Sequence, residues 1–515
     1  MQQPANANAD HVRSRSQWAL LVAIVLVVEL AYVFFVSAGH MRDWHTYHTY
    51  IDYLAEGFQS GHLYISLAPT PELLASPDPF DGSNLYNWYW DASLYKKHYY
   101  LYWGPVPALL LAGVKIIFRI KAQVGDQYPV FAFTSLQLIA AALLLERMAR
   151  RLFGHIPLWF VMLAIAVVGF ANPTLYNLGR GGVYEAAITG GQAFVTLGLV
   201  FAFDAVCFEA DEPRRARRRL IAAGFCWALA LGCRVTLGPA VLFVGVATVL
   251  AASGREPGRW WRFLWNAIAT GGPVAVGVAL LLVYNRARFG EWLEFGMKYQ
   301  VSTLRFAMSK SWFGSNIWSY LFRPMKLTCT FPFAYGVPEM PDADAFPRWY
   351  KIPDKYWVNE QVIGIVKGVP WSWLATVAIG MAVRTGWRLA RKRPGVEVGA
   401  GDRRASYLTI VFIAALTMSM SLGMFMFTAT MRYMGDVIGA VCLLGTLGAW
   451  WLYTRCRERP LVRRIFVAAC IPLAVVSIAV GAALGFEGQY KHFRQHNPQM
   501  LDTLEAKLSV CGKKK

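Results

Sequence analysis

The chain has 515 residues, of which 56% are hydrophobic and only 16% are charged. A soluble protein carries about a quarter charged residues, so this composition excludes an ordinary soluble globular protein. Several apolar runs reach about 20 residues, the length at which a helix crosses a hydrocarbon core of about 30 Å. The alternating ten-residue pattern of a membrane β-barrel is absent from the sequence. We therefore predict an all-α polytopic membrane protein.

The net charge of +20 is concentrated in short gaps between the apolar runs. The basic clusters are Arg13/Arg15, Arg147/Arg150/Arg151, Arg214 to Arg219, Arg255/Arg259/Arg262, Arg384 to Arg404 and Arg455 to Arg464. Short cytoplasmic loops are rich in Lys and Arg, so these gaps are predicted to face the cytoplasm and the alternate gaps to face outward. Topology accounts for the excess charge, and no nucleic-acid partner is predicted.

About eleven membrane spans follow from this pattern. They are predicted near 18–38, 128–147, 156–177, 186–207, 219–233, 238–253, 263–285, 369–387, 406–428, 433–453 and 465–485. The first run is too long for the apolar core of a signal peptide and lacks an early cleavage site, so we expect it to be retained. Residues 1–485 then form one transmembrane domain, and 486–515 form a short outer tail.

Two long segments, 39–127 and 286–368, are predicted to be outer loops that carry interfacial helices. The apolar stretch 104–120 is interrupted by Pro105 and Pro107. A helix that crossed the membrane here would force the next basic clusters outward, against the charge rule. We therefore predict an interfacial or re-entrant helix at 104–120.

Two acids follow the first predicted span. Asp43 lies where the chain leaves the membrane, and a carboxylate at this depth can act as general base toward a polar acceptor while a lipid-linked donor lies in the bilayer. Asp52 lies in a segment with apolar residues at helical spacing, which predicts an amphipathic surface helix. Asp43 is the predicted catalytic acid and Asp52 the second candidate. An ordinary interfacial acid is the alternative for each.

Glu185 is the acid of the next outer turn, and it follows a glycine-rich stretch that also contains Arg180. Glycines permit close approach of the backbone to a ligand. We predict that Glu185 takes part in catalysis and that Arg180 is its partner or a phosphate ligand, while a simple salt bridge is the alternative. Tyr184 and His45 are further candidates for substrate binding.

Arginines at other span ends are the candidate phosphate ligands. Arg234 lies at the bend between two short spans, and Arg432, Tyr433 and Asp436 lie where one span ends and the next begins. An arginine fork holds a phosphate through two parallel hydrogen bonds. Arginines that converge at one membrane depth would suit a phosphate leaving group, and lipid-headgroup contact is the alternative.

The cofactor cannot be identified from the sequence. A divalent metal cation held by Asp43, His45 and His48 is the weak candidate. The eight cysteines show no CxxC spacing, and Cys329 and Cys511 are the two that are predicted to lie outside. These two could pair, but nothing in the sequence places them within bridging distance, so we expect free thiols.

At this point the residues resemble the GT-C superfamily of integral-membrane glycosyltransferases, which use polyprenyl-phosphate sugars. The superfamily includes protein O-mannosyltransferases, lipid A aminoarabinose transferases and the bacterial RgtA/B/C/D-like group. The topology resembles it over most of the chain. The more specific strings are 91–108 (DASLYKKHYYLYWGPVPA), 184–188 (YEAAI), 230–234 (ALGCR) and 432–436 (RYMGD).

The resemblance implies a bacterial inner-membrane hexosyl- or pentosyltransferase whose active site faces the periplasm. The donor would be a polyprenyl-phosphate sugar, the acceptor a glycan, lipid or protein, and the transfer would invert the anomeric carbon. Asp43 and Glu185 would be the acids of the first and second outer loops. The alternatives are a transporter or flippase of lipid-linked glycan and an oligosaccharide ligase or polymerase. A flippase predicts charges in the middle of spans, whereas here the charges lie at span ends.

Overall fold

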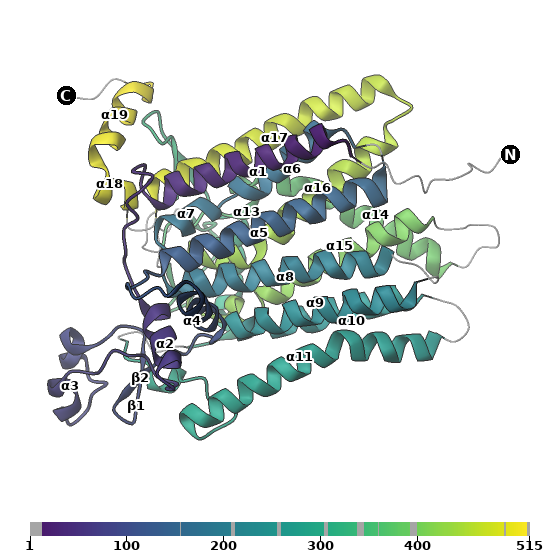
Figure 1. The fold of residues 1–515 in the computed structure, drawn as a ribbon. Helices are drawn as coiled ribbons and strands as arrows, with labels where there is room; N and C mark the ends of the chain where they lie inside the picture. Colours follow the sequence, from purple (N-terminus) through teal and green to yellow (C-terminus); the bar gives the residue numbers. More distant parts are fainter. Residues whose placement is uncertain are drawn as a thin grey trace.

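The computed structural model describes residues 13–154, 156–207, 212–254, 259–302, 307–336, 345–358, 360–391, 399–488 and 491–511. Long helices lie side by side with nearly parallel axes, and the outer loops and the C-terminal helices gather at one end of this bundle (Figure 1). The bundle helices are α1 (Arg15–Val36), α5 (Gln127–Met148), α6 (Leu158–Phe170), α8 (Val183–Cys207), α9 (Pro213–Cys233), α10 (Gly238–Ser253), α11 (Arg259–Phe289), α14 (Ala375–Ala390), α15 (Ala400–Ser419), α16 (Gly435–Arg455) and α17 (Pro460–Glu487).

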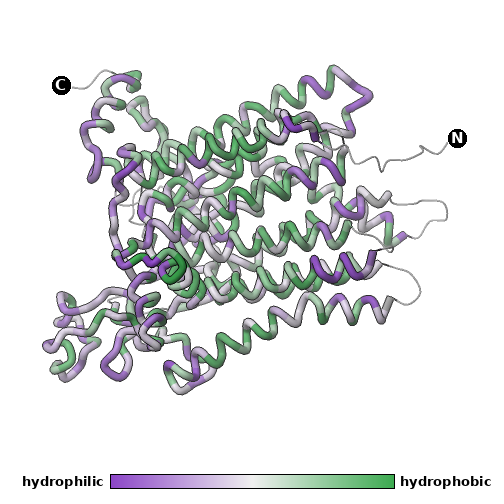
Figure 2. The backbone as a smooth tube through the Cα atoms, in the orientation of Figure 1, coloured by the Kyte–Doolittle hydropathy of each residue, from purple (hydrophilic) through white to green (hydrophobic). Residues whose placement is uncertain are grey.

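Within the described ranges, eight helices are long and apolar enough to cross a membrane. The predicted all-α polytopic class is thus confirmed, while the number of eleven spans stays a prediction. The tube in Figure 2 is green along the middle of the bundle helices, and purple gathers toward the ends of several, most clearly on α9. The predicted span 156–177 is divided in two, because α6 ends at Phe170 and α7 (Thr174–Gly179) begins after Pro173, which has no backbone N–H to continue a helix.

Short helices and small sheets lie at the outer end of the bundle. The short helices are α2 (Tyr50–Gln59), α3 (Pro71–Ala75), α4 (Val106–Phe118), α12 (Phe313–Leu321), α13 (Ile365–Gly368), α18 (His492–His496) and α19 (Pro498–Leu508), with single turns such as η8 (Gly423–Phe425) and η9 (Met431–Met434). The small sheets of the described residues are β1 (Ser93–Tyr95) with β2 (His98–Tyr100), β3 (Met325–Leu327) with β4 (Ala334–Gly336), both antiparallel, and β5 (Trp357–Val358) with β6 (Thr428–Ala429), which is parallel.

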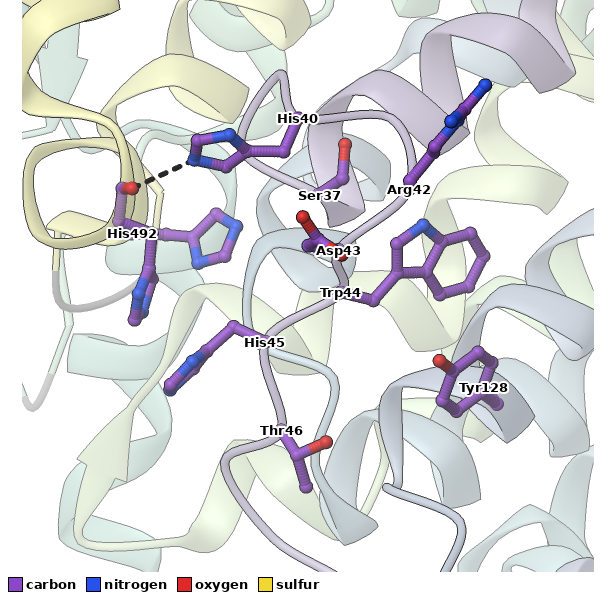
Figure 3. Close-up of a pocket in the computed structure, with 10 residues that line it drawn as sticks. Ser37, His40, Arg42, Asp43, Trp44, His45, Thr46, Tyr128 and His492 are labelled. Carbon is purple, nitrogen blue, oxygen red and sulfur yellow. Dashed lines mark hydrogen bonds between the residues drawn. The ribbon is translucent and has the colours of Figure 1, made fainter.

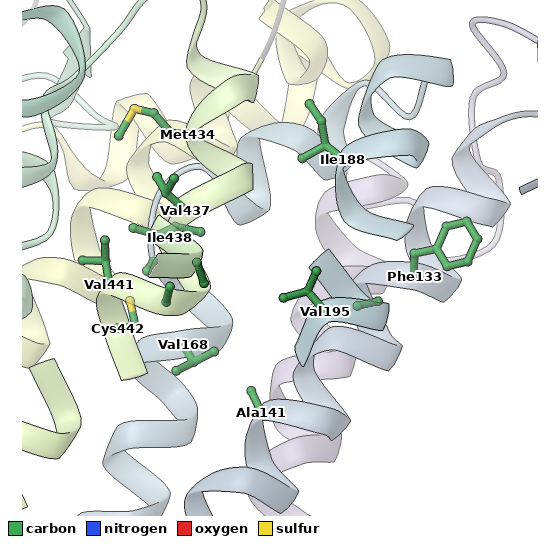
Figure 4. Close-up of a cluster of buried hydrophobic side chains, with 14 of the residues drawn as sticks. Phe133, Ala141, Val168, Ile188, Val195, Met434, Val437, Ile438, Val441 and Cys442 are labelled. Carbon is green, nitrogen blue, oxygen red and sulfur yellow. The ribbon is translucent and has the colours of Figure 1, made fainter. Parts of the chain in front are cut away.

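Helices differ greatly in how much protein surrounds them. Each helix is compared over an apolar window of 18 residues. The buried share of this window is 89% in α8, 78% in the stretch 431–455 and 11% in α11. The first two helices are therefore central, and α11 lies at the edge. Figure 4 shows part of the core that surrounds α8 and α16, with Phe133, Val195 and Val441 among its side chains. Lipid tails are as apolar as Leu, so close helix packing relies on small residues, and Gly448 accordingly lies directly against the carbonyl of Leu374.

The helix predicted at 104–120 is present as α4, and it runs across the direction of the bundle helices (Figure 1). Its Lys115 Nζ lies 2.6 Å from Oδ1 of Asp52 on α2, and the Asp52 side chain is fully buried. Asp52 also accepts the backbone N–H of Val124 at 3.1 Å. Asp52 therefore joins α2 to α4, and it lines neither of the two pockets described below. Its catalytic role stays a prediction.

Basic residues at the opposite end of the bundle do more than set topology. The buried carboxylate of Asp204 on α8 lies 3.0 Å from Arg147, 3.4 Å from Arg151 and 3.8 Å from Arg219. A buried carboxylate requires such partners, because its desolvation is costly. These contacts connect α5, its π-helical extension (Ala149–Phe153) and α9 to α8.

The C-terminal helices are fastened to the second outer loop by a disulfide between Cys329 and Cys511. The expectation of two free thiols was therefore wrong. The two Cα atoms lie 5.4 Å apart although 182 residues separate them in sequence. Only the folded position of α18 and α19 at the outer end brings them together, and no sequence spacing signals this.

We predict that Lys115→Met lowers the melting temperature in detergent strongly, because it leaves the buried Asp52 carboxylate unpaired. Loss of one partner of a buried ion pair costs about 3–5 kcal/mol. The double variant Asp52→Asn/Lys115→Met should recover much of the loss, since no charge then remains buried. An additive loss in the double variant would contradict this account.

Candidate active site

A cavity of about 390 Å³ lies where the outer ends of α8, α9, α11, α15 and α16 meet the two outer loops. Its polar lining residues are Asp91, Tyr102, Tyr184, Arg234, Thr236, Tyr284, Asn285, Arg288, Gln300, Ser302, Ser419, Thr428, Thr430, Arg432, Tyr433 and Asp436. Its remaining wall is mainly apolar and includes Leu281, Phe295, Met420 and Leu422. We call this space the arginine cavity.

Arg432 is the central cation of the cavity. It belongs to η9, the turn that leads into α16, and its guanidinium lies 3.6 Å from Glu185 and 3.3 Å from Glu360. Its backbone N–H donates to Glu360 at 3.2 Å, and its guanidinium lies over the ring of Tyr184 at 4.4 Å. Burial raises the pKa of Glu360, and Arg432 offsets part of this shift. Glu185 is thus the buried counter-ion of Arg432.

A second ion pair lines the same cavity. Arg234 follows the last residue of α9, and its guanidinium lies 2.9 Å from Asp436 in the first turn of α16. The ring of Tyr433 lies 5.3 Å from the Arg234 guanidinium. The structure therefore brings together the predicted residues Arg234, Arg432, Tyr433 and Asp436.

Arg288 at the outer end of α11 differs from these arginines because no carboxylate pairs with it among the described residues. Its side chain is buried and donates to the carbonyl of Leu101 at 2.5 Å and to Asn285 at 2.7 Å. Both acceptors are neutral. Glu294 acts on Arg288 from beyond ion-pair distance and is itself paired with Lys298 at 3.1 Å. Arg288 thus places a positive charge without a direct ion-pair partner on the wall of the arginine cavity, where an anion would be stabilised.

The acid that faces the cavity from the first outer loop is Asp91, which the sequence reasoning did not select. It has a positive φ of 61°, a conformation that Asp tolerates better than most residues. Its backbone N–H donates to Val301 at 3.1 Å, and its carboxylate accepts from the Gln300 amide at 2.8 Å. Desolvation raises the pKa of Asp91, while Gln300 and Arg432 act in the opposite direction.

Asp43 and His45 lie elsewhere. They line a second, more open pocket of about 500 Å³ with Ser37, His40, Arg42, Trp44, Thr46, Tyr128, His492 and His496 (Figure 3). We call it the histidine pocket. Asp43 is exposed there and does not line the arginine cavity. The predicted catalytic acid Asp43 therefore lies in a different pocket from the predicted phosphate ligands Arg234 and Arg432.

Arg180 and His48 contact each other, and they line neither of the two pockets. The Arg180 guanidinium lies 3.3 Å from Nε2 of His48. Burial of the imidazole and, to a smaller extent, the positive charge of Arg180 lower the pKa of His48 to about 4. His48 is therefore neutral at pH 7 and accepts from Arg180. A Cβ on Gly182 would lie 2.9 Å from Glu185 and 3.7 Å from His48, so Gly182 lets these two side chains approach.

The metal candidates do not come together. His48 faces Arg180, whereas Asp43 and His45 line the histidine pocket. Across the described ranges, no group of three or more His, Cys, Asp or Glu side chains is arranged to hold a metal ion. A divalent cation therefore stays a prediction without a defined site.

Comparison with known proteins finds likeness in solved structures alone. No family model matches the sequence, and no curated protein matches it. The oligosaccharyltransferase of Archaeoglobus fulgidus aligns with a TM-score of 0.50 and 13% identity, over 98% of this chain and 62% of that one. ArnT from Cupriavidus metallidurans aligns with a TM-score of 0.43 and 13% identity, over 93% of this chain and 77% of that one.

This chain therefore has the fold of the archaeal oligosaccharyltransferase, a GT-C-like fold as the sequence resemblance predicted. It spans less than two thirds of the length of the archaeal oligosaccharyltransferase. At this low identity the likeness concerns the fold, and the chemistry has to be argued from the two pockets.

We predict that Arg432→Met lowers the melting temperature in detergent far more than Arg288→Met. The first change leaves Glu185 and Glu360 buried without their cation, at a cost of about 3–5 kcal/mol. The second leaves no carboxylate without its ion-pair partner, and the loss of two hydrogen bonds to neutral acceptors is offset by removal of the cost of burying the Arg288 charge. Equal losses would contradict the charge assignment.

Proposed function

We propose that this protein is a glycosyltransferase that moves a sugar from a polyprenyl-phosphate carrier to a hydroxyl group of an acceptor. The observation that carries the proposal is that Arg288 has no direct ion-pair partner among the described residues and lines a cavity whose other wall is apolar. A lipid phosphate combines these two requirements, because its phosphate needs a cation and its tail needs apolar surface. The GT-C fold, which an oligosaccharyltransferase shares, supports the same class of reaction.

The charges of the cavity favour Arg288 as the first phosphate ligand. Arg432 and Arg234 already neutralise buried carboxylates, and so they add little net charge. When a phosphate binds, their guanidinium groups can still donate hydrogen bonds, since each has more donors than its carboxylates occupy. Phosphate neutralisation of this kind stabilises the departing anion and supplies much of the rate.

Asp91 is the proposed general base. Its carboxylate faces the arginine cavity and would take the proton of the acceptor hydroxyl. The acceptor oxygen then forms a bond to the anomeric carbon as the bond from that carbon to the phosphate oxygen breaks. The polyprenyl phosphate leaves with the electron pair, and the anomeric carbon is inverted. The raised pKa of Asp91 suits a base that must hold a proton after transfer.

Asp43 remains the sequence-based alternative for the base, and Glu185 is proposed to act through Arg432. The proposed location is a bacterial inner membrane, with both pockets on the periplasmic side. The predicted topology supports this side, because the basic clusters lie at the opposite end of the bundle. Transport of a lipid-linked glycan without a new glycosidic bond is the competing outcome in the assays.

We expect undecaprenyl phosphate to raise the melting temperature of the wild-type protein in detergent and the Arg288→Met variant to lose most of this shift. A ligand that binds the folded state alone stabilises it by RT ln(1 + [L]/Kd). Undecaprenol, which has the tail without the phosphate, is the control and should give little shift. Equal shifts from both lipids, or an unchanged shift in Arg288→Met, would contradict phosphate binding at Arg288.

We further expect Asp91→Asn to reduce sugar transfer by about 10²- to 10⁴-fold, the usual contribution of a general base. Transfer is measured by mass spectrometry, with a polyprenyl-phosphate sugar pool as donor. The matched surface variant Glu72→Gln, in the same outer loop, should leave the rate unchanged. A large loss in Asp43→Asn with a small loss in Asp91→Asn would assign the base to Asp43 instead.

The pH profile provides the second readout of this experiment. The base acts in its deprotonated form, so wild-type transfer should fall as the pH falls through the pKa of Asp91. Burial raises that pKa, and activity should therefore be lost at a higher pH than an exposed Asp would require. The residual transfer of Asp91→Asn should lack this acid limb. A flipping signal in liposomes without any new glycosidic bond would refute the glycosyltransferase proposal itself.

A further inference from the structure

Helix α18 contributes His492 and His496 to the wall of the histidine pocket, and α18 and α19 together are held at two separated points. The first point is the segment that follows α1, where Nδ1 of His492 and Nε2 of His496 lie 2.9 Å and 2.8 Å from the Tyr47 hydroxyl. The second point is the second outer loop, where Cys511 forms the disulfide with Cys329.

The first point is built from imidazole rings. The ring of His45 stacks on that of His496 with centroids 3.8 Å apart, and Nε2 of His40 lies 3.0 Å from the carbonyl of His496. Two more contacts join the segments: Asn497 donates to the carbonyl of Ala38 at 2.9 Å, and Phe493 packs against the ring of Phe35. Figure 3 shows His40, His45 and His492 around one space with Asp43.

Proton uptake at this junction would place like charges against one another. Four imidazoles meet there, and the Tyr47 hydroxyl can donate to only one of its two ring nitrogens, so the other ring must present N–H to it. Protonated rings would both be donors toward Tyr47, and the stacked pair His45 and His496 would carry two positive charges at contact distance. Acid therefore breaks this junction by charge repulsion and by loss of acceptors.

Other charged groups near the junction are few. The segment after α1 adds Arg42 and Asp43, and Arg180 acts on Tyr47 from across the pocket. On the tail, Arg494 pairs with Asp502 and Glu505, so its charge is already balanced. Lys491 also lies at the start of α18. Asp43 is the carboxylate that lines the pocket, and one acid does not balance several imidazolium groups.

We propose that α18 and α19 are an acid-releasable wall of the histidine pocket, which the disulfide keeps attached to the second outer loop when the histidine junction opens. At the tethered end, Val510 donates to the carbonyl of Cys329 at 2.8 Å and Phe331 donates to the Ser509 hydroxyl at 3.0 Å. These contacts do not titrate in this range. Release at the histidines therefore swings the wall open and leaves its far end in place.

The direction of the pH dependence follows from linkage. Burial lowers the pKa of His492 to about 3 and also lowers the pKa of His496, with neighbouring histidines adding to each shift. A released histidine has a pKa near 6.5, so the released state binds more protons below that pH. Docking is fully favoured only well above pH 6.5 and weakens as the pH falls, by about 15-fold between pH 6.5 and 5 from His492 alone.

Amide hydrogen exchange of the full-length protein in detergent tests the proposal without any substrate. Protection of residues 492–508, corrected for the intrinsic pH dependence of exchange, should fall at least about 15-fold between pH 6.5 and 5, while protection of α5 stays constant. The variant His492→Gln/His496→Gln keeps polar partners for Tyr47 and should lose the pH dependence. His62→Gln, a histidine of the first outer loop outside this junction, is the matched control and should behave as wild type.

Cys511→Ser provides the second arm. At pH 5 the wild-type protein should keep protection at residues 509–511, whereas this variant should lose it together with the rest of the wall. Unchanged protection of 492–508 between the two pH values would overturn the proposal. So would a pH dependence that persists in the double glutamine variant. Failure of sugar transfer would leave these readouts unaffected, so the two proposals are judged separately.

Discussion

The outer end of this bundle is organised around one buried guanidinium. Arg432 lies between Glu185 at the start of α8 and Glu360 from the second outer loop, and it belongs to the turn that starts α16. None of the three charges is stable in this environment without the others. Their mutual requirement fixes two central helices and one outer loop in a single arrangement, and the wall of the arginine cavity follows from it.

The same arrangement explains why two pockets exist rather than one. Gly182 sits between Glu185 and His48, and the absence of a side chain there lets the first outer loop pack directly against the start of α8. His48 in turn holds Arg180. This layer separates the arginine cavity, which has the paired cations, from the histidine pocket, which has the exposed Asp43. In the proposed reaction, this layer separates the arginine cavity, where the carrier would bind, from the more open and polar histidine pocket.

Much of the fold was predictable, because hydrophobic length and basic clusters report directly on membrane crossing. Charged residues at span ends were also informative: Arg234, Arg432 and Asp436 do meet, since span ends lie at a common depth. Arg288 and Glu360 were not selected, because nothing local marks an arginine that lacks a partner or a carboxylate that will meet one. For the same reason, nothing local showed that Asp43 lies in a separate pocket from the arginines. The Cys329–Cys511 disulfide depends on a contact between distant parts of the chain, which no local pattern predicts.

The peripheral position of α11 has a consequence for carrier recognition. Arg288 stands at the outer end of a helix in which only 11% of the apolar window is buried by protein. A carrier anchored at Arg288 would lay its isoprenoid units along this bare flank and into the surrounding lipid. The protein would then recognise the headgroup, while the surrounding bilayer would accommodate the isoprene units. Carriers of different length would therefore be equivalent at the reacting end.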